Sequence, residues 1–432
     1  MSVIHHSEDT RKKIRESINS TRTRRKNMDC KVYKLKINPR KLSAKNREKL
    51  VRVFLEAKWL KNHIIAGDIL FDVSSTIREV GVKLPDGTVE KRKLKNLSSH
   101  MKDSLISSMK SNVKGLSVLK SHGRKVGGLN FCSKVSAIPL KEYGNTYVIN
   151  REKNRVKVQK VGWLRVSGLD NIPEDVEFAN AVLVDKADGY FIHVTTYTDN
   201  SPERVYLCNE VLGIDMGIAT SITTSNGEKF DLYVEEPDRL KGLRRKLSRQ
   251  EKGSNNYRKT LRSIAVVVLK TLRRKKDMAY KFVSDLSHYE HVYFQDEMLS
   301  SWKKRDSLAH GGRKIQCGIL GLVKTMLASK DWATMLPSST PTTQLCICGA
   351  KNKHQLSHRV YFCSNCGYTE DRDVHAAKNM IRCGTRKNTA IPQGLGITPV
   401  EKNTSTLHFN FLEGRVSDYS AKQEARPSSV GG

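Results

Sequence analysis

The sequence predicts an α+β protein built from several domains. Its 432 residues exceed what one hydrophobic core usually organises. Alternating, strand-like patterns occur on both sides of a helical, lysine-rich stretch, and four cysteines cluster in the last third of the chain. These three observations indicate a small antiparallel β-barrel interrupted by helices, followed by a second domain whose clustered cysteines point to a bound metal.

The charge of the chain points to a polyanionic partner. The chain has 77 Lys and Arg against 44 Asp and Glu, which gives a formal net charge of +33. The positive side chains repel one another in the folded protein unless nucleic acid or another polyanion offsets their charge. A membrane surface is the alternative, but the longest apolar run, Ile264 to Leu269, is too short to span a bilayer. The N-terminal segment also lacks the apolar run of a secretion signal. We therefore expect a nucleic-acid-binding protein in the cytoplasm or on the nucleoid.

The first half of the chain contains the predicted barrel and helices. Residues 1–29 are polar and basic and predict a mobile arm, whose phrase HSEDTRKKIRESI is similar to modular DNA-binding repeats of homing endonucleases. A strand over Lys31–Ile37 precedes an amphipathic helix over Arg47–Ile65, and a second helical stretch is expected over 87–126. Short alternating runs between 128 and 200 predict the remaining barrel strands.

Three carboxylates lie at predicted strand and helix edges in the second half. Asp215 follows the apolar strand of LGIDMG, Glu297 ends the strand of HVYFQDE next to Asp296, and Asp373 opens a helical pattern. Each alone has an ordinary structural explanation: a hairpin turn, an acidic strand end and an N-cap. Together they form an acidic set suited to phosphodiester hydrolysis with Mg²⁺ or Mn²⁺, because hard divalent ions prefer carboxylate oxygens.

The cysteine cluster predicts a structural zinc site. Cys363 and Cys366 form a knuckle with the usual spacing, whereas Cys346 and Cys348 are separated by one residue instead of two. Four thiolates at this separation are typical of a zinc ribbon. The short first knuckle leaves the role of Cys346 open, and a nearby histidine, His354 or His358, could replace it.

Basic runs recur along the chain without acidic blocks to balance them. One such run is usually a solvated helix face, but together they favour phosphate contacts. The runs are Lys91 to Lys93, Arg244 to Lys246, Arg273 to Lys276 and Lys303 to Arg305. Of the four tryptophans, Trp59, Trp163, Trp302 and Trp332, at least two are expected in the core and the others could stack on bases.

The order of these motifs resembles a known family. GIDMG, FQDE, TPTTQLCICG, CSNCG and DRDVHAAKNM follow one another as in the TnpB nucleases of insertion sequences and the related miniature type V CRISPR effectors, most closely over residues 205–385. The resemblance implies a wedge-type antiparallel β-barrel interrupted by a helical recognition lobe, then an RNase H-like (RuvC) α/β domain with an inserted zinc ribbon. The implied domains are a basic arm (1–29), first barrel strands (30–48), recognition lobe (49–126), remaining barrel (127–204), first RuvC nuclease segment (205–340), zinc ribbon for target nucleic acid (341–370), second RuvC nuclease segment (371–390) and a disordered tail (391–432).

The same resemblance implies the activity and the site. A prokaryotic RNA-guided endonuclease of this kind cuts double-stranded DNA beside a short flanking motif, as a monomer or homodimer on one guide RNA. Its Mg²⁺ ligands would be Asp215, Glu297 and Asp373, with Asp296 and Asp371 as less favoured neighbours, and its Zn²⁺ ligands Cys346, Cys348, Cys363 and Cys366. The family often has Asn where this chain has His375. The alternatives are a cleavage-inactive RNA-guided repressor, a DNA transposase with an acidic triad, and a basic zinc-ribbon RNA-binding protein without catalysis.

Overall fold

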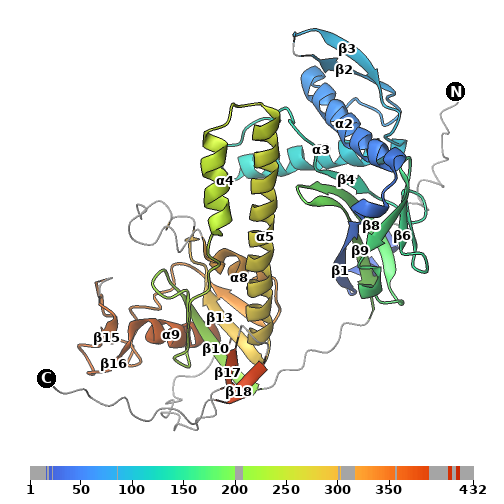
Figure 1. Cartoon of the computed structure of the whole chain (residues 1–432). Helices are drawn as coiled ribbons and strands as arrows, with labels where there is room; N and C mark the ends of the chain where they lie inside the picture. The colour runs from blue at the N-terminus through green and yellow to red at the C-terminus, as the bar shows by residue number, and fades with distance from the viewer. Residues whose placement is uncertain are drawn as a thin grey trace. The chain divides into compact units, whose positions relative to one another are not determined.

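The chain divides into two compact units, Met1–Glu203 and Arg204–Gly432 (Figure 1). The structure is a computed structural model. It describes Glu16 and residues 19–21, 23–84, 86–199, 208–299, 302, 317–355, 358–388, 407–410 and 415–418. No helix among these residues is both long and apolar enough to cross a membrane.

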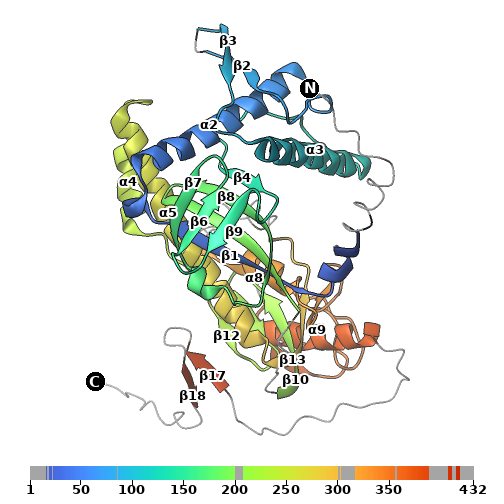
Figure 2. The same cartoon turned by 90° about the vertical axis from the view of Figure 1, so that its right-hand side faces the viewer.

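The first unit contains a nearly closed antiparallel barrel of seven strands in the order β4-β8-β9-β1-β7-β6-β5 (Figure 2). The strands are β1 (Asp29–Ile37), β4 (Ala137–Leu140), β5 (Tyr147–Asn150), β6 (Arg155–Val158), β7 (Gly162–Ser167), β8 (Glu177–Lys186) and β9 (Gly189–Thr198). The early strand β1 pairs with β9 and β7, so the predicted barrel and its interruption after the first strand are confirmed. Strands β6 and β7 alternate strictly: Val156, Val158, Leu164 and Val166 are buried, and the residues between them face outward.

Two helices and a hairpin are inserted into this unit. Helix α2 (Ala44–Gly67) matches the expected amphipathic helix, and its N-cap Ser43 accepts a hydrogen bond from the amide of Asn46 at 3.2 Å. The expectation of one helix over 87–126 is wrong at its start. There β3 (Val89–Lys93) pairs with β2 (Glu79–Lys83) across a turn at Gly87, and only then does α3 (Ser99–Ser121) begin. Pairing with β2 makes the lysine-rich segment Val89–Lys93 a strand, and helical propensity alone does not report such pairing.

The C-terminal end of the expected mobile arm contacts the barrel. Arg24 and Arg25 both form ion pairs with Glu177 of β8, at 2.7 and 2.6 Å, and the Arg25 guanidinium lies 4.8 Å from the Tyr197 ring. Residues 1–15, which include most of the HSEDTRKKIRESI phrase, lie outside the described residues.

The second unit is organised around a mixed five-stranded sheet in the order β12-β11-β10-β13-β14. Its strands are β10 (Cys208–Met216), β11 (Ile222–Thr224), β12 (Lys229–Phe230), β13 (Tyr289–Gln295) and β14 (Ala333–Leu336), and its helices are α4 (Asp238–Ser248), α5 (Asn255–Leu286), α8 (Leu320–Leu327) and α9 (Arg372–Asn388). Strands β13 and β14 run parallel to β10, whereas β11 runs antiparallel to it. The carboxyl ends of β10 and β13 therefore meet at one edge of the sheet.

Each face of this sheet packs against different helices. Leu212 and Ile214 of β10 join Val292 and Phe294 of β13 in a core closed by α5 and α8. Tyr293 of β13, on the opposite face, packs with residues of α9, among them Met380. Because side chains alternate along a strand, Gly213 and Asp215 lie on the face that α9 covers.

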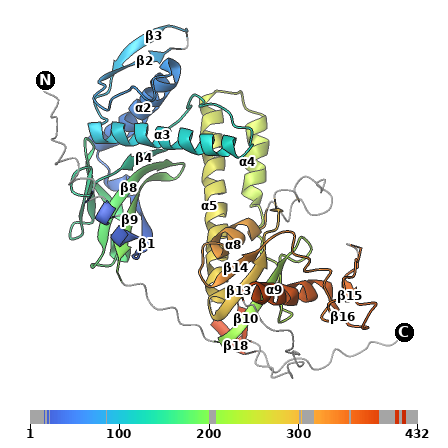
Figure 3. The same cartoon turned by 180° about the vertical axis from the view of Figure 1, so that it is seen from behind.

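The cysteine region forms a small ribbon next to α9 (Figure 3). Strands β15 (Val360–Phe362) and β16 (Thr369–Asp371) pair antiparallel, and α9 follows directly after β16. In the tail, β17 (Leu407–Asn410) pairs with β18 (Arg415–Asp418). Alternating apolar residues at Leu407 and Phe409 favour such a strand pair. The rest of 391–432 lies outside the described residues.

Candidate active site and metal centre

Three elements bring the predicted carboxylates toward one edge of the second sheet. Asp215 stands one residue before the end of β10, and Glu297 follows the adjacent parallel strand β13 by two residues. Asp373 is the second residue of α9. Since Ile214 is in register with Phe294, Asp215 and Glu297 emerge from neighbouring strands at the same edge.

Glycines allow α9 to pack directly on these strands. A Cβ added at Gly213 would lie 1.9 Å from the carbonyl oxygen of Ala377, and one added at Gly384 would lie 2.1 Å from the ring of Tyr293. Ala377 is one helical turn after Asp373, and Gly213 precedes Asp215 by two residues on the same face. The missing side chains therefore allow the approach that brings Asp373 toward Asp215.

The electrostatics of Asp215 reflect this convergence. Burial, reinforced by the negative charges of Asp373 and Glu297, raises the pKa of Asp215 to about 8, with Arg372 opposing. Burial also raises the pKa of Glu297, against the opposing charge of Lys324. Mutual repulsion of this kind is what a bound divalent cation offsets, and carboxylate oxygens are the ligands that Mg²⁺ prefers. The three carboxylates therefore fit a divalent metal. Their oxygen atoms are not grouped as closely as the sulfur atoms of the cysteines described below.

The neighbouring carboxylates have other partners. Asp371 accepts hydrogen bonds from the amides of Asp373 (3.0 Å) and Val374 (3.2 Å), and it forms an ion pair with Lys229 at 2.7 Å. Asp371, and not Asp373, thus caps α9, which corrects the N-cap interpretation of Asp373. Burial alone would raise the pKa of Asp371, but these hydrogen bonds hold it below its usual value. Asp296 is paired with Lys324, whose ammonium also donates to the Glu297 carbonyl at 2.7 Å.

The four clustered cysteines form a compact metal-binding group. All four sulfur atoms lie within 4.8 Å of one another, and among the described residues this is the group of His, Cys, Asp and Glu atoms that is arranged to hold an ion. The Sγ atoms of Cys346 and Cys366 are 3.6 Å apart, and those of Cys348 and Cys363 are 3.7 Å apart. Tetrahedral zinc with Zn–S bonds of about 2.3 Å requires sulfur separations of roughly 3.8 Å. The cluster suggests a structural zinc ion, and Cys346 takes part in it despite its short knuckle.

Backbone geometry explains how the short knuckle still delivers its sulfur. Gly349 and Gly367 both have positive φ, 87° and 71°, at equivalent turns of the two knuckles. The Cys346 amide donates to the Ala350 carbonyl at 2.8 Å, which closes the first turn. Burial would raise the pKa of Cys363, but hydrogen bonds from the amides of Cys366 and Asn365 lower it to about 6 and so stabilise the thiolate. His354, one of the proposed substitutes, instead packs edge-on against Tyr361, with ring centroids 4.9 Å apart.

Two buried residues connect the ribbon to the sheet and to α9. The sequence analysis gave neither of them a role. Asn379 is fully buried and donates to the carbonyls of Thr342 (2.7 Å) and Leu345 (2.6 Å). The Gln295 amide donates to three carbonyls of residues 337–340 and its oxygen accepts from the Thr342 hydroxyl at 3.0 Å. A polar residue in an otherwise apolar pattern was the available signal, because buried amides need several partners.

His375 belongs to the same connection. It is fully buried, its Nε2 lies 2.9 Å from the Leu345 carbonyl oxygen, and its ring stacks on Tyr361 with centroids 3.7 Å apart. Burial lowers the pKa of His375, which favours the neutral ring. The residue that departs from the family pattern is therefore a packing contact between α9 and the ribbon.

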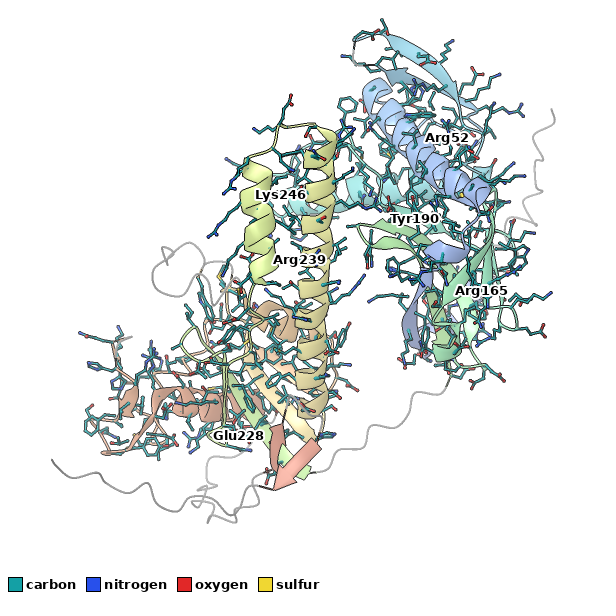
Figure 4. All side chains as sticks on the ribbon, viewed as in Figure 1. Arg52, Arg165, Tyr190, Glu228, Arg239 and Lys246 are labelled. Atoms are coloured by element: carbon teal, nitrogen blue, oxygen red, sulfur yellow. The ribbon has the colours of Figure 1, made fainter. Side chains whose placement is uncertain are left out.

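A basic cavity lies between α4 and α5 of the second unit. It has a volume of about 570 Å³, and its lining contains five cations and no acidic side chain among the described residues. The cations are Arg239, Lys259, Arg262, Lys270 and Arg274. Figure 4 labels Arg239 and Lys246 among the side chains that this helix pair presents. Of the described residues in the predicted basic runs, only Arg274 lines this cavity, whose cluster of cations is suited to phosphates.

Comparisons with known proteins agree with this arrangement. Residues 334–380, from β14 through the ribbon into α9, match the family model described as Cas12f1-like, TNB domain. A protein of Streptomyces pristinaespiralis named "Putative RNA-guided DNA endonuclease" is 28% identical over 272 residues, which cover 60% of this chain and 63% of that protein. Escherichia coli (strain K12) has a relative named "Putative RNA-guided DNA endonuclease InsQ", 23% identical over 260 residues that cover 55% of this chain and 63% of the relative.

The chain is similar to TnpB-type RNA-guided endonucleases. The resemblance expected from the order of motifs is thereby confirmed. The matched regions span 63% of the length of each TnpB-type relative, less than two thirds. A solved Cas12f1–sgRNA–target DNA complex overlays on 82% of this chain and 99% of its own, with 13% sequence identity and a TM-score of 0.45.

Proposed function

We propose that this chain is an RNA-guided DNA endonuclease that cuts double-stranded DNA beside a short flanking motif. The observation that carries the proposal is the convergence of Asp215, Glu297 and Asp373, in which burial, reinforced by the two other carboxylates, raises the pKa of Asp215. The mixed sheet that presents them supports an RNase H-like (RuvC) core. The names of the two relatives support the same activity.

In this mechanism the three carboxylates would hold a divalent metal at the edge of the sheet where β10 and β13 end. Divalent ions bound there would activate the attacking water and stabilise the leaving oxygen. Asp215 and Glu297 come from adjacent strands and Asp373 from the helix across the sheet face, so the site depends on the packing of α9. Asp371 keeps the first turn of α9 in place through its cap and its ion pair with Lys229.

We assign the remaining regions to nucleic-acid binding. The barrel (30–48 and 127–204) and the recognition lobe (49–126) would hold the guide RNA, and the zinc ribbon (341–370) would contact target nucleic acid beside the nuclease segments (205–340 and 371–390). Specificity would come from base pairing between guide and target, with the protein contacting mainly phosphates. The net charge of +33 supports nucleic-acid binding by the chain as a whole.

The test is a cleavage assay with the native RNA. The full chain is expressed with its flanking DNA, the co-purifying RNA is sequenced, and the complex is incubated with a target library of randomised flanks in Mg²⁺. We expect one defined RNA and cuts beside one flanking motif, abolished by Asp215→Ala. Asp277→Ala, which removes an exposed carboxylate of α5 paired with Lys281, is the matched control and should cut normally.

Other outcomes would identify the alternatives. Target binding without cleavage by the parent protein would favour the repressor. Joined strands in place of hydrolysed ends would favour the transposase, and the absence of a defined RNA would contradict guided cleavage.

A further inference from the structure

A small pocket on the outer surface of the barrel combines cations with an exposed indole. It has a volume of about 230 Å³ and lies where the start of α2 meets strands β6 and β7. Its lining consists of Lys41, Ser43, Asn46, Arg155, Trp163 and Arg165. The volume is below the range of roughly 300–1,000 Å³ that holds drug-sized ligands, so it suits a single phosphate or base.

The two arginines of this pocket lie opposite each other on neighbouring strands. Arg155 and Arg165 are directly opposite in the β6–β7 pairing, and both point outward because their neighbours on each strand are buried. Figure 4 labels Arg165 on this sheet. Like charges directly opposite each other destabilise a strand pair. Lys41 adds a third cation, and no acidic side chain lines the pocket among the described residues. An anion bound between the guanidinium groups would offset this repulsion.

Trp163 supplies a flat apolar surface next to those charges. Its side chain is 42% exposed, whereas Trp59 and Trp332 are 9% and 7% exposed and belong to the core, as expected for two of the tryptophans. Its cross-strand neighbour on the outer face is Lys157, so the indole lies among cations. An exposed indole beside phosphate-binding groups is the arrangement with which proteins stack unpaired bases.

The frame of the pocket is fixed before any ligand arrives. The Asn46 side-chain amide donates to the Trp163 carbonyl at 3.0 Å and ties β7 to the start of α2. Gly162, with φ of 116°, precedes Trp163, and a Cβ there would lie 3.4 Å from the Asn46 side-chain oxygen. The indole and the arginines therefore stand on paired strands and not on a loop, which reduces the entropy lost on binding.

We infer that this pocket binds one nucleotide of a single-stranded segment, with the base stacked on Trp163 and the phosphate between Arg155 and Arg165. The inference rests on the proposed function, because it names how the barrel would hold nucleic acid. A paired base inside a helix presents only its edges, so the base on Trp163 must be unpaired or at a helix end. The strand can come from RNA or from DNA, since phosphate and base are common to both.

Photo-crosslinking of the full chain tests the inference without cleavage. Hexanucleotides that carry one 5-iodouracil, as RNA and in a separate arm as DNA, are irradiated with the protein in the absence of Mg²⁺, and the crosslinked peptide is identified by mass spectrometry. We expect a crosslink at Trp163. The arm that crosslinks more efficiently, RNA or DNA, identifies the nucleic acid that supplies the bound strand. An abasic hexamer should compete about 5- to 150-fold less well than a uridine hexamer, as expected for one stacked base.

Variants separate the cationic side of the pocket from the indole. Arg155→Gln should raise the concentration needed for half-maximal crosslinking at Trp163 and make the salt dependence shallower by about 0.7 in log–log slope, the value for one phosphate contact on a single strand. Arg24→Gln removes the same charge from a guanidinium already paired with Glu177, and should change neither quantity.

A Trp163 peptide that crosslinks with neither RNA nor DNA would overturn the inference, as would abasic competition equal to that of uridine. These results do not depend on Asp215, Glu297 or Asp373. Guided cleavage without a Trp163 crosslink would therefore refute the proposed pocket and support the proposed nuclease activity. A Trp163 crosslink without cleavage would support the pocket and contradict the nuclease activity.

Discussion

Replacing Gly213 by Ala should damage the proposed nuclease site from inside the core. The new Cβ would lie 1.9 Å from the carbonyl oxygen of Ala377 and 2.8 Å from its carbonyl carbon, closer than real Cβ contacts, which essentially never fall below 3.0 Å. Both obstacles are backbone atoms, so no side-chain rotation relieves the clash. Helix α9 must move away from β10 by roughly 1 Å, and Asp373 moves with it.

The expected magnitudes follow from this displacement. Overpacking a core costs about 1–3 kcal/mol of unfolding free energy, and a shift of about 1 Å in a catalytic group can lower the rate by roughly 100-fold. Single-turnover cleavage with saturating RNA and Mg²⁺ measures the rate, and thermal unfolding of the same preparation measures the stability. Raising the Mg²⁺ concentration further should not restore the rate, because the clash remains.

Gly242→Ala is the matched control. Gly242 lies in α4 of the same unit, and a Cβ there meets nothing within 4 Å. Since Ala is favoured over Gly inside a helix, this variant should cut normally and unfold at the same or a slightly higher temperature. If Gly213→Ala cut at the parental rate and melted at the parental temperature, the account of α9 packing would be refuted.

Three further predictions concern the ribbon, its connection to α9, and the barrel. The parent protein should contain about one zinc ion per chain by elemental analysis, and Cys346→Ser should lose it, whereas retention of zinc would show that this sulfur is not a ligand. Asn379→Ala leaves the Thr342 and Leu345 carbonyls without their buried donor and should cost about 1–3 kcal/mol in chemical denaturation, with Asn145→Ala on the exposed barrel surface as the neutral control. Burial, with Lys186 and Lys34 nearby, lowers the pKa of His193 to about 4, so the unfolded chain takes up a proton first as the pH falls. Stability of the first unit should decrease between about pH 6.5 and 4, by at most about 1 kcal/mol after solvent screening, and His193→Gln should remove that contribution to the slope.

Sequence patterns were sufficient for most elements of the fold. The barrel strands, α2 and the strands before Asp215 and Glu297 have alternating or helical periodicity that reports which face is buried. Periodicity did not predict the hairpin of β2 and β3. The lysine-rich segment Val89–Lys93 becomes a strand because it pairs with Glu79–Lys83. The pattern alone could not distinguish that pairing from a solvated helix.

Sequence also supplied the candidate ligands but not their arrangement. The three carboxylates and four cysteines could be proposed from residue type and spacing, because metal ions select oxygen or sulfur donors. Which of Asp371 and Asp373 caps α9 depended on hydrogen-bond geometry, and so did the participation of Cys346 in the cluster. Both depend on backbone angles of a few residues, which composition does not report.

The sequence by itself determined which chemical groups the protein carries: an excess of cations, four clustered cysteines, and the three carboxylates that we propose as ligands of a divalent metal. Tertiary structure alone decided which groups meet. No sequence pattern marks Gly213 and Gly384 as important. In the structure, their missing side chains let α9 contact the strands and bring Asp373 toward Asp215. Arg155, Arg165 and Trp163 likewise become one pocket only through the register of β6 and β7. Such contacts arise between residues distant in the chain or across a strand pair, where steric fit and not local propensity selects the structure.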